Sequence, residues 1–238
     1  MIKKGFYLCL AIAIFFLGLY SCKRKSSDKN QYGLDVIQNI ERYESLIEKN
    51  PDNVLIDLKT FIPGIVLDIR YATTNNFTGQ QIYNSPRAFA RKPVAEALKN
   101  IQTQLNEKGL GLKIFDAYRP YAATVKFYEV YPDTNFVAAP WNGSRHNRGC
   151  AVDVTLVDLA SGKQLSMPTP FDDFTEKAAA DYTQLSDSII ANRQLLSKVM
   201  KENGFAIYPY EWWHFDYTGW EHYNLLDLSF EELEKFKD

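Results

Sequence analysis

The chain has only three histidines, and two of them, His146 and His214, each share a short segment with a carboxylate that could act together with them. His146 shares the segment 144-SRHNRGCAVD-153 with Asp153, and His214 ends the segment 211-EWWH-214, which begins with Glu211. A catalytic zinc site takes three protein ligands and keeps a further position open. His146, Asp153 and His214 meet that requirement, and a nearby Glu211 can exchange protons without binding the metal. Either segment alone would also suit a packed structural histidine, so the hypothesis depends on the two together.

Two short strands can bring these side chains to one point. Residues 149–156 alternate in polarity, which places Asp153 on the more polar face, and a strand at 213–217 puts His214 and Asp216 on one face. If the two strands are antiparallel neighbours, Asp153 and His214 meet, and His146 approaches from the preceding loop. Asp216 is then placed to support a ligating histidine. Trp212 and Trp213 alternate, so one is expected in the pocket and the other in the core.

The remaining pattern predicts a mixed fold. Apolar spacing predicts helices at 35–48, 87–108, 121–131 and 188–203, and strands at 54–61, 65–71 and 112–117. Helices and short strands do not alternate as regular βαβ units. The expected class is therefore α+β, with a small antiparallel central sheet flanked by helices.

Composition limits the possible functions. Hydrophobic residues make up 46% of the 238 residues, which is enough for a sizeable core. The net charge of −2 leaves no basic excess for nucleic acid, and nothing in the sequence indicates a protein partner. We interpret Cys150 as a small buried apolar residue rather than a ligand, and His222 as a surface or packing residue.

The N-terminus has the features of an export signal. Lys3 and Lys4 precede an apolar run, and 18-GLYSC-22 resembles a bacterial lipobox, which predicts lipidation at Cys22. An ordinary signal peptide, with Cys22 incidental, is the alternative. We therefore expect a lipoprotein signal at 1–21, a polar tether at 22–34, and a catalytic domain with an N-terminal helix at 35–238. The lipid would anchor an exported protein to a membrane, facing the periplasm or the cell surface.

Several separated motifs resemble one family. The pattern Ser144-x-His146-x-x-Gly149-x-Ala151-x-Asp153 followed by Glu211-Trp212-Trp213-His214 resembles the D-alanyl-D-alanine dipeptidases, the VanX-type zinc peptidases with the hedgehog/DD-peptidase fold. Two further stretches, 68-DIRYATTNNFTG-79 and 116-DAYRP-120, resemble other motifs of that family. The similarity covers about residues 54–220.

The resemblance implies a role for each matching residue. His146, Asp153 and His214 would bind one zinc ion, Glu211 would act as general base and then acid, and Arg119 would stabilise the oxyanion. For Arg119, a structural ion pair with Asp116 is the alternative interpretation, and both can hold because a fixed partner would orient the guanidinium. Substrate-pocket roles would fall to Tyr71 and Ser144. Asp172 and Asp173 could meet the ammonium group of the substrate or belong to a surface loop.

The expected function is hydrolysis of D-Ala-D-Ala or a related cell-wall dipeptide during peptidoglycan turnover. A D,D-carboxypeptidase or endopeptidase acting on longer peptidoglycan stems would use the same metal site. A lipoprotein that binds wall peptides without cleaving them is the alternative from another class, although it would have no need of Glu211 or Arg119. An exported enzyme is better suited to digesting released wall peptides than to depleting a cytoplasmic precursor.

Overall fold

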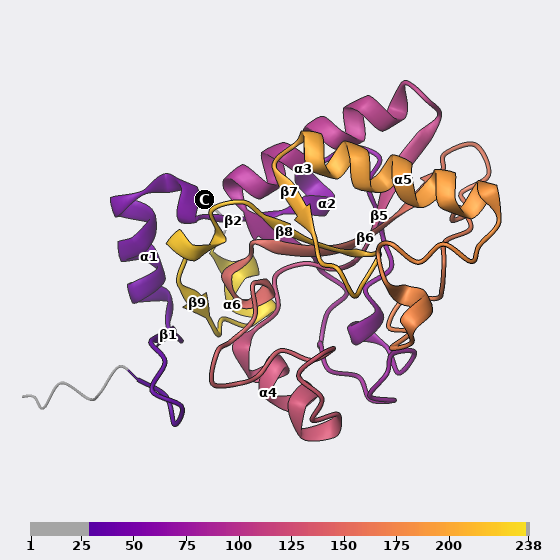
Figure 1. The fold of residues 1–238 in the computed structure, drawn as a ribbon. Helices are drawn as coiled ribbons and strands as arrows, with labels where there is room; N and C mark the ends of the chain where they lie inside the picture. Colours follow the sequence, from indigo (N-terminus) through magenta and orange to yellow (C-terminus); the bar gives the residue numbers. More distant parts are fainter. Residues whose placement is uncertain (1–28, 237–238) are drawn as a thin grey trace, which may run out of the picture.

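The structure is a computed structural model that describes residues 29–236. Its centre is a five-stranded sheet in the order β3-β5-β6-β8-β7 (Figure 1). The strands are β3 (Val66–Leu67), β5 (Leu110–Asp116), β6 (Ala151–Asp158), β8 (His214–Tyr217) and β7 (Phe205–Ile207). All neighbours are antiparallel except β3 and β5. Together with the helices, this arrangement confirms the predicted α+β class with a small, largely antiparallel central sheet.

Helices cover the sheet on both sides. Figure 1 shows α3 (Lys92–Asn106) and α5 (Asp187–Glu202) along one side, and α4 (Tyr121–Val130) on the other. The apolar stripe of α3, spaced by three and four residues, is entirely buried: Val94, Leu98, Ile101 and Leu105. The sheet is therefore held between two layers, and the face toward α4 remains for the polar residues described below.

A smaller group of elements closes one end of the molecule. Here β1 (Val36–Ile37) pairs in parallel with β9 (Leu225–Leu226), and β2 (Leu55–Asp57) pairs antiparallel with β4 (Phe89–Arg91). The helices α1 (Ile40–Lys49), α2 (Leu58–Phe61) and α6 (Phe230–Lys235) surround these pairs. A capping box, in which the Ser229 and Glu232 side chains bond each other's backbone, fixes the start of α6. This end thereby joins the N-terminal segment to the C-terminal one.

Several predicted boundaries were wrong for identifiable reasons. The helix expected from residue 35 begins at Ile40, because 36–37 are buried as a strand and the Asn39 side chain caps the helix. The strand expected over 54–61 stops at Asp57, which caps α2. The helix expected from residue 87 begins only at Lys92, since 89–91 pair with β2. Long-range pairing thus overrode local periodicity at the first positions of two helices.

The predicted signal at 1–21, the lipidation site Cys22 and the tether up to residue 28 lie outside the described residues. In the part of the predicted tether that the structure describes, the Asn30 side chain accepts hydrogen bonds from the backbone of Tyr32 and Leu34. Within residues 29–236, no helix has the length and apolar character needed to cross a membrane.

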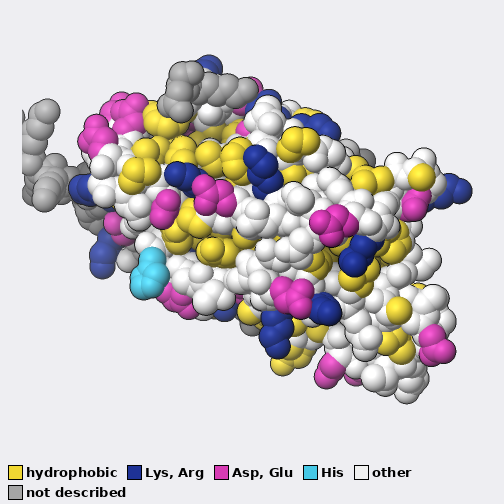
Figure 2. Space-filling model, turned by 90° about the horizontal axis from the view of Figure 1, so that it is seen from above, with side chains coloured by type: hydrophobic (Ala, Val, Ile, Leu, Met, Phe, Trp, Pro, Cys, Tyr) yellow, Lys and Arg dark blue, Asp and Glu magenta, His cyan; other side chains and the backbone are white. Residues whose placement is uncertain are grey.

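On the face in Figure 2, acidic and basic side chains are interspersed rather than gathered by sign.

Candidate metal centre and active site

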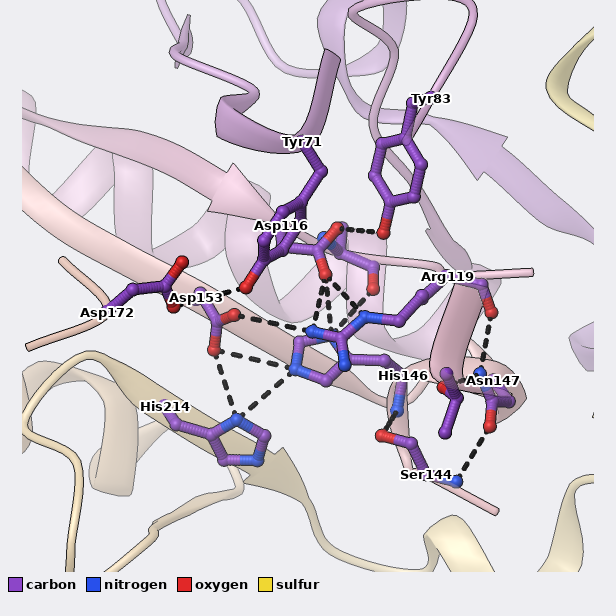
Figure 3. A network of polar contacts seen from close by, with 12 residues as sticks. Tyr71, Tyr83, Asp116, Arg119, Ser144, His146, Asn147, Asp153, Asp172 and His214 are labelled. Carbon is purple, nitrogen blue, oxygen red and sulfur yellow. Dashed lines mark hydrogen bonds and ion pairs between the residues drawn. The ribbon is translucent and has the colours of Figure 1, made fainter. Parts of the chain in front are cut away.

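Three side chains from two strands and a turn converge on one point (Figure 3). The register of β6 and β8 places Asp153 directly opposite His214, and His146 comes from the 3₁₀ turn His146–Arg148. His214 Nδ1 lies 3.0 Å from Asp153 Oδ1 and 3.2 Å from His146 Nε2. The distance between Asp153 Oδ1 and His146 Nε2 is 3.5 Å. All three residues offer a ligand atom within 4.8 Å of the others. The structure thus brings together the three residues predicted to bind metal.

The two imidazoles are oriented by their outer nitrogens. His146 Nδ1 lies 2.7 Å from the carbonyl oxygen of Ala117, to which it donates, so Nε2 is left facing the centre. His214 Nε2 lies 3.0 Å from Asp216 Oδ1, which leaves Nδ1 facing the centre. Such outer hydrogen bonds fix the tautomer and the ring orientation of metal-binding histidines. Asp216 therefore occupies the supporting position that strand alternation predicted.

Gly149 ends the turn that carries His146. Its φ is +69°, in the left-handed region, and a Cβ there would lie 2.6 Å from Leu55 Cδ2. Its backbone N–H donates to the carbonyl of His146, and its carbonyl accepts from Arg91. A glycine is required here both by conformation and by space. The turn then leads directly into β6, which sets the distance between His146 and Asp153.

The charges around the triad fit a bound cation. Although burial opposes ionisation, His146 and His214 hold the pKa of Asp153 well below its usual range. The groups at or next to the centre include more carboxyl groups than guanidinium groups, namely Asp116, Asp153, Asp172, Glu211 and Asp216 against Arg119, Arg145 and Arg148. Two nitrogens and one carboxylate oxygen form a donor set suited to catalytic zinc. The residues present therefore fit a divalent metal.

Arg119 lies beside the triad in a fixed orientation. Its Nε and Nη2 donate to Asp116 Oδ2 at 2.9 and 2.8 Å, and Asp116 Oδ1 accepts from the hydroxyl of Tyr83 at 3.0 Å. Arg119 Nη2 is also 3.9 Å from Asp153 Oδ2. Burial opposes the charge, but Asp116, Tyr83, Tyr71 and Asp153 together outweigh it, and the pKa of Arg119 lies well above its ordinary value. The predicted ion pair with Asp116 is present, and Arg119 also lines the cavity, while its oxyanion role stays a prediction.

Glu211 stands next to the centre, in the turn before β8. Its Oε2 lies 3.8 Å from His214 Nδ1, and its side chain is 9% exposed. Burial is the main cause that raises the pKa of Glu211 to about 8, with His214 opposing the shift and Asp153 adding to it. A carboxyl group near this value can both accept and return a proton close to neutral pH.

A cavity of about 480 Å³ opens over the triad. Its lining includes both predicted pocket residues, Tyr71 and Ser144, and the Ser144 hydroxyl accepts from the backbone of His146 at 3.2 Å. Trp212 and Trp213 are both buried, but Trp213 lines the cavity, whereas Trp212 donates from Nε1 to Thr169 Oγ1 at 2.9 Å. Both lie in the turn before β8 and belong to the buried core, and only Trp213 reaches the pocket, so the expectation of one pocket and one core tryptophan is met in part.

Asp172 and Asp173, considered together from the sequence, differ in the structure. Asp172 lines the cavity, accepts from the Tyr71 hydroxyl at 3.1 Å, and keeps its other oxygen buried without a hydrogen-bond partner. It is also the single non-glycine residue with positive φ (61°) among residues 29–236. Burial, followed by Asp153 and Glu211, raises the pKa of Asp172 well above its usual value. Asp173 instead accepts a hydrogen bond from the backbone of Thr175.

Three loop segments meet over the mouth of the cavity, a feature that sequence reasoning missed. Phe136 stacks on Phe174, with ring centroids 4.9 Å apart, and the Tyr208 hydroxyl donates to the carbonyl of Asn135 at 3.3 Å. All four residues line the cavity. Only the aromatic residues of these three segments could have suggested the contacts between them. The mouth is therefore narrowed by side chains that the metal centre does not need.

The other two candidate ligands lie elsewhere. Cys150 is fully buried, and burial raises the pKa of its thiol to about 12. His222 is exposed in the 3₁₀ turn Trp220–His222. Neither belongs to the group whose ligand atoms converge.

A convergent His–Asp–His set, with a buried glutamate and a fixed arginine over one cavity, defines the site of a metal-dependent hydrolase. Comparison with known families identifies which one. Residues 52–232 match the D-ala-D-ala dipeptidase family of peptidases, Peptidase_M15, so the chain belongs to this family. The family assignment confirms the predicted resemblance and the predicted metallopeptidase class.

Curated relatives agree with this assignment. The chain is 35% identical to the D-alanyl-D-alanine dipeptidase of Escherichia coli K12 over 74% of this chain and 91% of that protein. It is 30% identical to the enzyme of the same name from Enterococcus faecalis, over 69% of this chain and 91% of that protein. A solved structure of the D,D-pentapeptidase VanY with Zn(II) is distantly similar: 16% identity, a TM-score of 0.36, and coverage of 62% of this chain and 84% of that one.

Proposed function

We propose that this protein hydrolyses D-Ala-D-Ala or a closely related cell-wall dipeptide, using one zinc ion held by His146, Asp153 and His214. The observation that carries the proposal is the convergence of these ligands with Glu211 and Arg119 over one cavity. Family membership supports the same substrate class. When bound, zinc supplies a Lewis acid that polarises the scissile carbonyl.

The protein residues divide the remaining work. Glu211 takes a proton from the attacking water and delivers it to the departing amine, for which its buried position beside His214 is suited. Arg119, held by Asp116, stabilises the oxygen that becomes negative in the tetrahedral intermediate. Since its orientation is fixed before substrate arrives, little reorganisation is needed when that charge develops.

We assign Asp172 to binding the amino end of the substrate. A free α-ammonium supplies the positive partner that its unpaired buried oxygen lacks. Tyr71 holds the other oxygen in place. A carboxyl group in the same cavity as the metal-binding triad would select substrates whose amino terminus is free, which favours a dipeptide over a long stem.

The test compares substrates and metal content. Purified protein is offered D-Ala-D-Ala and a stem pentapeptide, and released D-alanine is measured for each. We expect rapid release from the dipeptide, a zinc content close to one per chain, and loss of zinc in His214→Ala. Glu211→Gln should retain zinc and lose roughly 100-fold or more in kcat. Preference for the pentapeptide would point to a carboxypeptidase. If wild type and Glu211→Gln both bind the peptides and neither releases D-alanine, the protein would be a non-catalytic binder.

We also propose that the protein is exported and lipidated at Cys22, with the catalytic domain at 35–238 acting on released wall peptides. The support is the lipobox-like segment before Cys22, which lies outside the described residues. Labelled palmitate should be incorporated into the wild-type chain and not into Cys22→Ser. If neither wild type nor Cys22→Ser incorporates labelled palmitate, the protein is not lipidated.

A further inference from the structure

The cavity contains a guanidinium for which the assignments above give no role. Arg145 lines the cavity next to the metal-binding turn, and its side chain is 41% exposed. Its guanidinium carbon lies 4.8 Å from the ring centroid of Trp220. Asp216 is its single ion-pair partner among the described residues, with Oδ2 3.4 Å from Nε, a contact that lacks hydrogen-bond geometry. The donors of Arg145 are thus largely unused.

The other two arginines at the cavity are already occupied. Arg119 gives two donors to Asp116 and is buried. Arg148 donates from Nη1 to the carbonyl of Tyr223. Of the cavity-lining cations in the described part of the chain, Arg145 therefore has the greatest capacity to receive an anion.

Arg145 is also held in place without using its end groups. Its carbonyl accepts from the backbones of Arg148 and Cys150, which ties it to the turn that carries His146. The cation–π contact with Trp220 restrains the guanidinium without using its N–H donors, and Arg145 lines the cavity. A fixed guanidinium edge matches the two oxygens of a carboxylate.

We propose that Arg145 binds the C-terminal carboxylate of the substrate; this inference rests on the proposed dipeptidase function. A free dipeptide is a zwitterion, and a cavity that takes it whole needs an acidic group at one end and a basic group at the other. Figure 3 places Asp172 and Ser144, the neighbour of Arg145, on opposite sides of the triad. The scissile carbonyl would then lie over the triad, with the ammonium toward Asp172 and the carboxylate toward Arg145.

A positioning role is the competing explanation. Arg145 contacts Asp216, and Asp216 supports His214, so loss of Arg145 could act through the metal ligand alone. The two roles differ in their dependence on substrate charge. A carboxylate-binding residue matters only when the substrate has a free carboxylate, whereas a positioning residue affects every substrate equally and disturbs zinc content.

The experiment measures kcat and KM for D-Ala-D-Ala and for its C-terminal amide, in wild type, Arg145→Ala and Arg145→Lys, with zinc content measured in each. The matched control is Arg42→Ala. It removes an arginine of α1 that pairs at the surface with Asp35, a residue before that helix. We expect wild type to prefer the acid. Arg145→Ala should lose roughly 10- to 100-fold in kcat/KM on the acid, mainly through KM, and change little on the amide. Arg145→Lys should fall between.

The remaining outcomes separate the two proposals. Equal losses on acid and amide in Arg145→Ala would overturn the carboxylate assignment in favour of positioning. Wild-type activity without preference for the acid would overturn it while the dipeptidase function stands. Absence of activity on both substrates would refute the dipeptidase function and the Arg145 role with it. If Arg145→Ala fails to fold, Arg145→Lys and the wild-type preference decide the question.

Discussion

Replacement of Asp116 by Asn tests the ion pair that orients Arg119. Asp116 is 1% exposed and accepts from Arg119 twice, from Tyr83 and from the backbone of Ala117. Removing one member of a buried pair leaves the other charge unpaired and costs about 3–5 kcal/mol. We expect about 3 kcal/mol for Asp116→Asn, because the amide oxygen still accepts hydrogen bonds. At roughly 2–4 °C per kcal/mol, Tm should fall by about 6–12 °C.

Asp35→Asn is the matched control for that measurement. Asp35 pairs with Arg42 at 2.9 Å, nearly the distance between Asp116 and Arg119, but the two side chains are 46% and 34% exposed. An exposed pair contributes about 0–1 kcal/mol, so its loss should shift Tm little. Urea unfolding at fixed zinc gives both free energies. The reasoning is refuted if the two variants lose the same stability, or if Asp116→Asn keeps full kcat, since a loosened Arg119 should lower it at least about tenfold.

Three further outcomes follow from other parts of the chain. A thiol reagent at pH 8 should leave Cys150 unmodified until urea is added, in a protein whose other cysteines are serine, because burial raises its thiol pKa to about 12; rapid native labelling would contradict this. Gly149→Ala should lower the free energy of unfolding by about 1–3 kcal/mol more than Gly109→Ala does, since both have positive φ but Gly149 alone meets a neighbour, Leu55, at 2.6 Å; equal losses in urea would exclude the steric contribution. Phe136→Ala should widen the mouth of the cavity and so raise kcat/KM for the pentapeptide relative to kcat/KM for D-Ala-D-Ala. If the ratio of these two values is unchanged, the mouth does not determine specificity.

The sequence indicated the parts of the site that regular structure positions. Alternation along 149–156 and 213–217 was enough to place Asp153, His214 and Asp216 on one side of paired strands, and the register pairs Asp153 with His214 directly. Period two is a strong signal, because a slip of one residue would turn every side chain to the other face. The stripe of α3 was equally clear, since a helix buried along one face needs apolar residues at fixed spacing.

Element boundaries could not be obtained in the same way. Val36 and Ile37 continue the apolar spacing of α1, yet they form a strand because Leu225 and Leu226 lie beside them. That partner is far away in the sequence, so no local pattern announces it. The same limit applies to 89–91, which pair with β2 before α3 begins. At such positions, pairing with a distant strand determines whether the residues form strand or helix, and local propensity is only compatible with the outcome.

The residues that sequence reasoning left undecided or missed lie on turns and loops, and they concern the substrate rather than the metal. Asp172 sits in a left-handed turn, Arg145 precedes a 3₁₀ turn, and Phe136 belongs to an irregular loop. A sheet with fixed register can hold one metal-binding set while its loops vary. The choice between a dipeptide and a longer stem therefore depends on these loops: a shared metal centre alone cannot distinguish the two activities, but a paired acid and base at opposite ends of the cavity can.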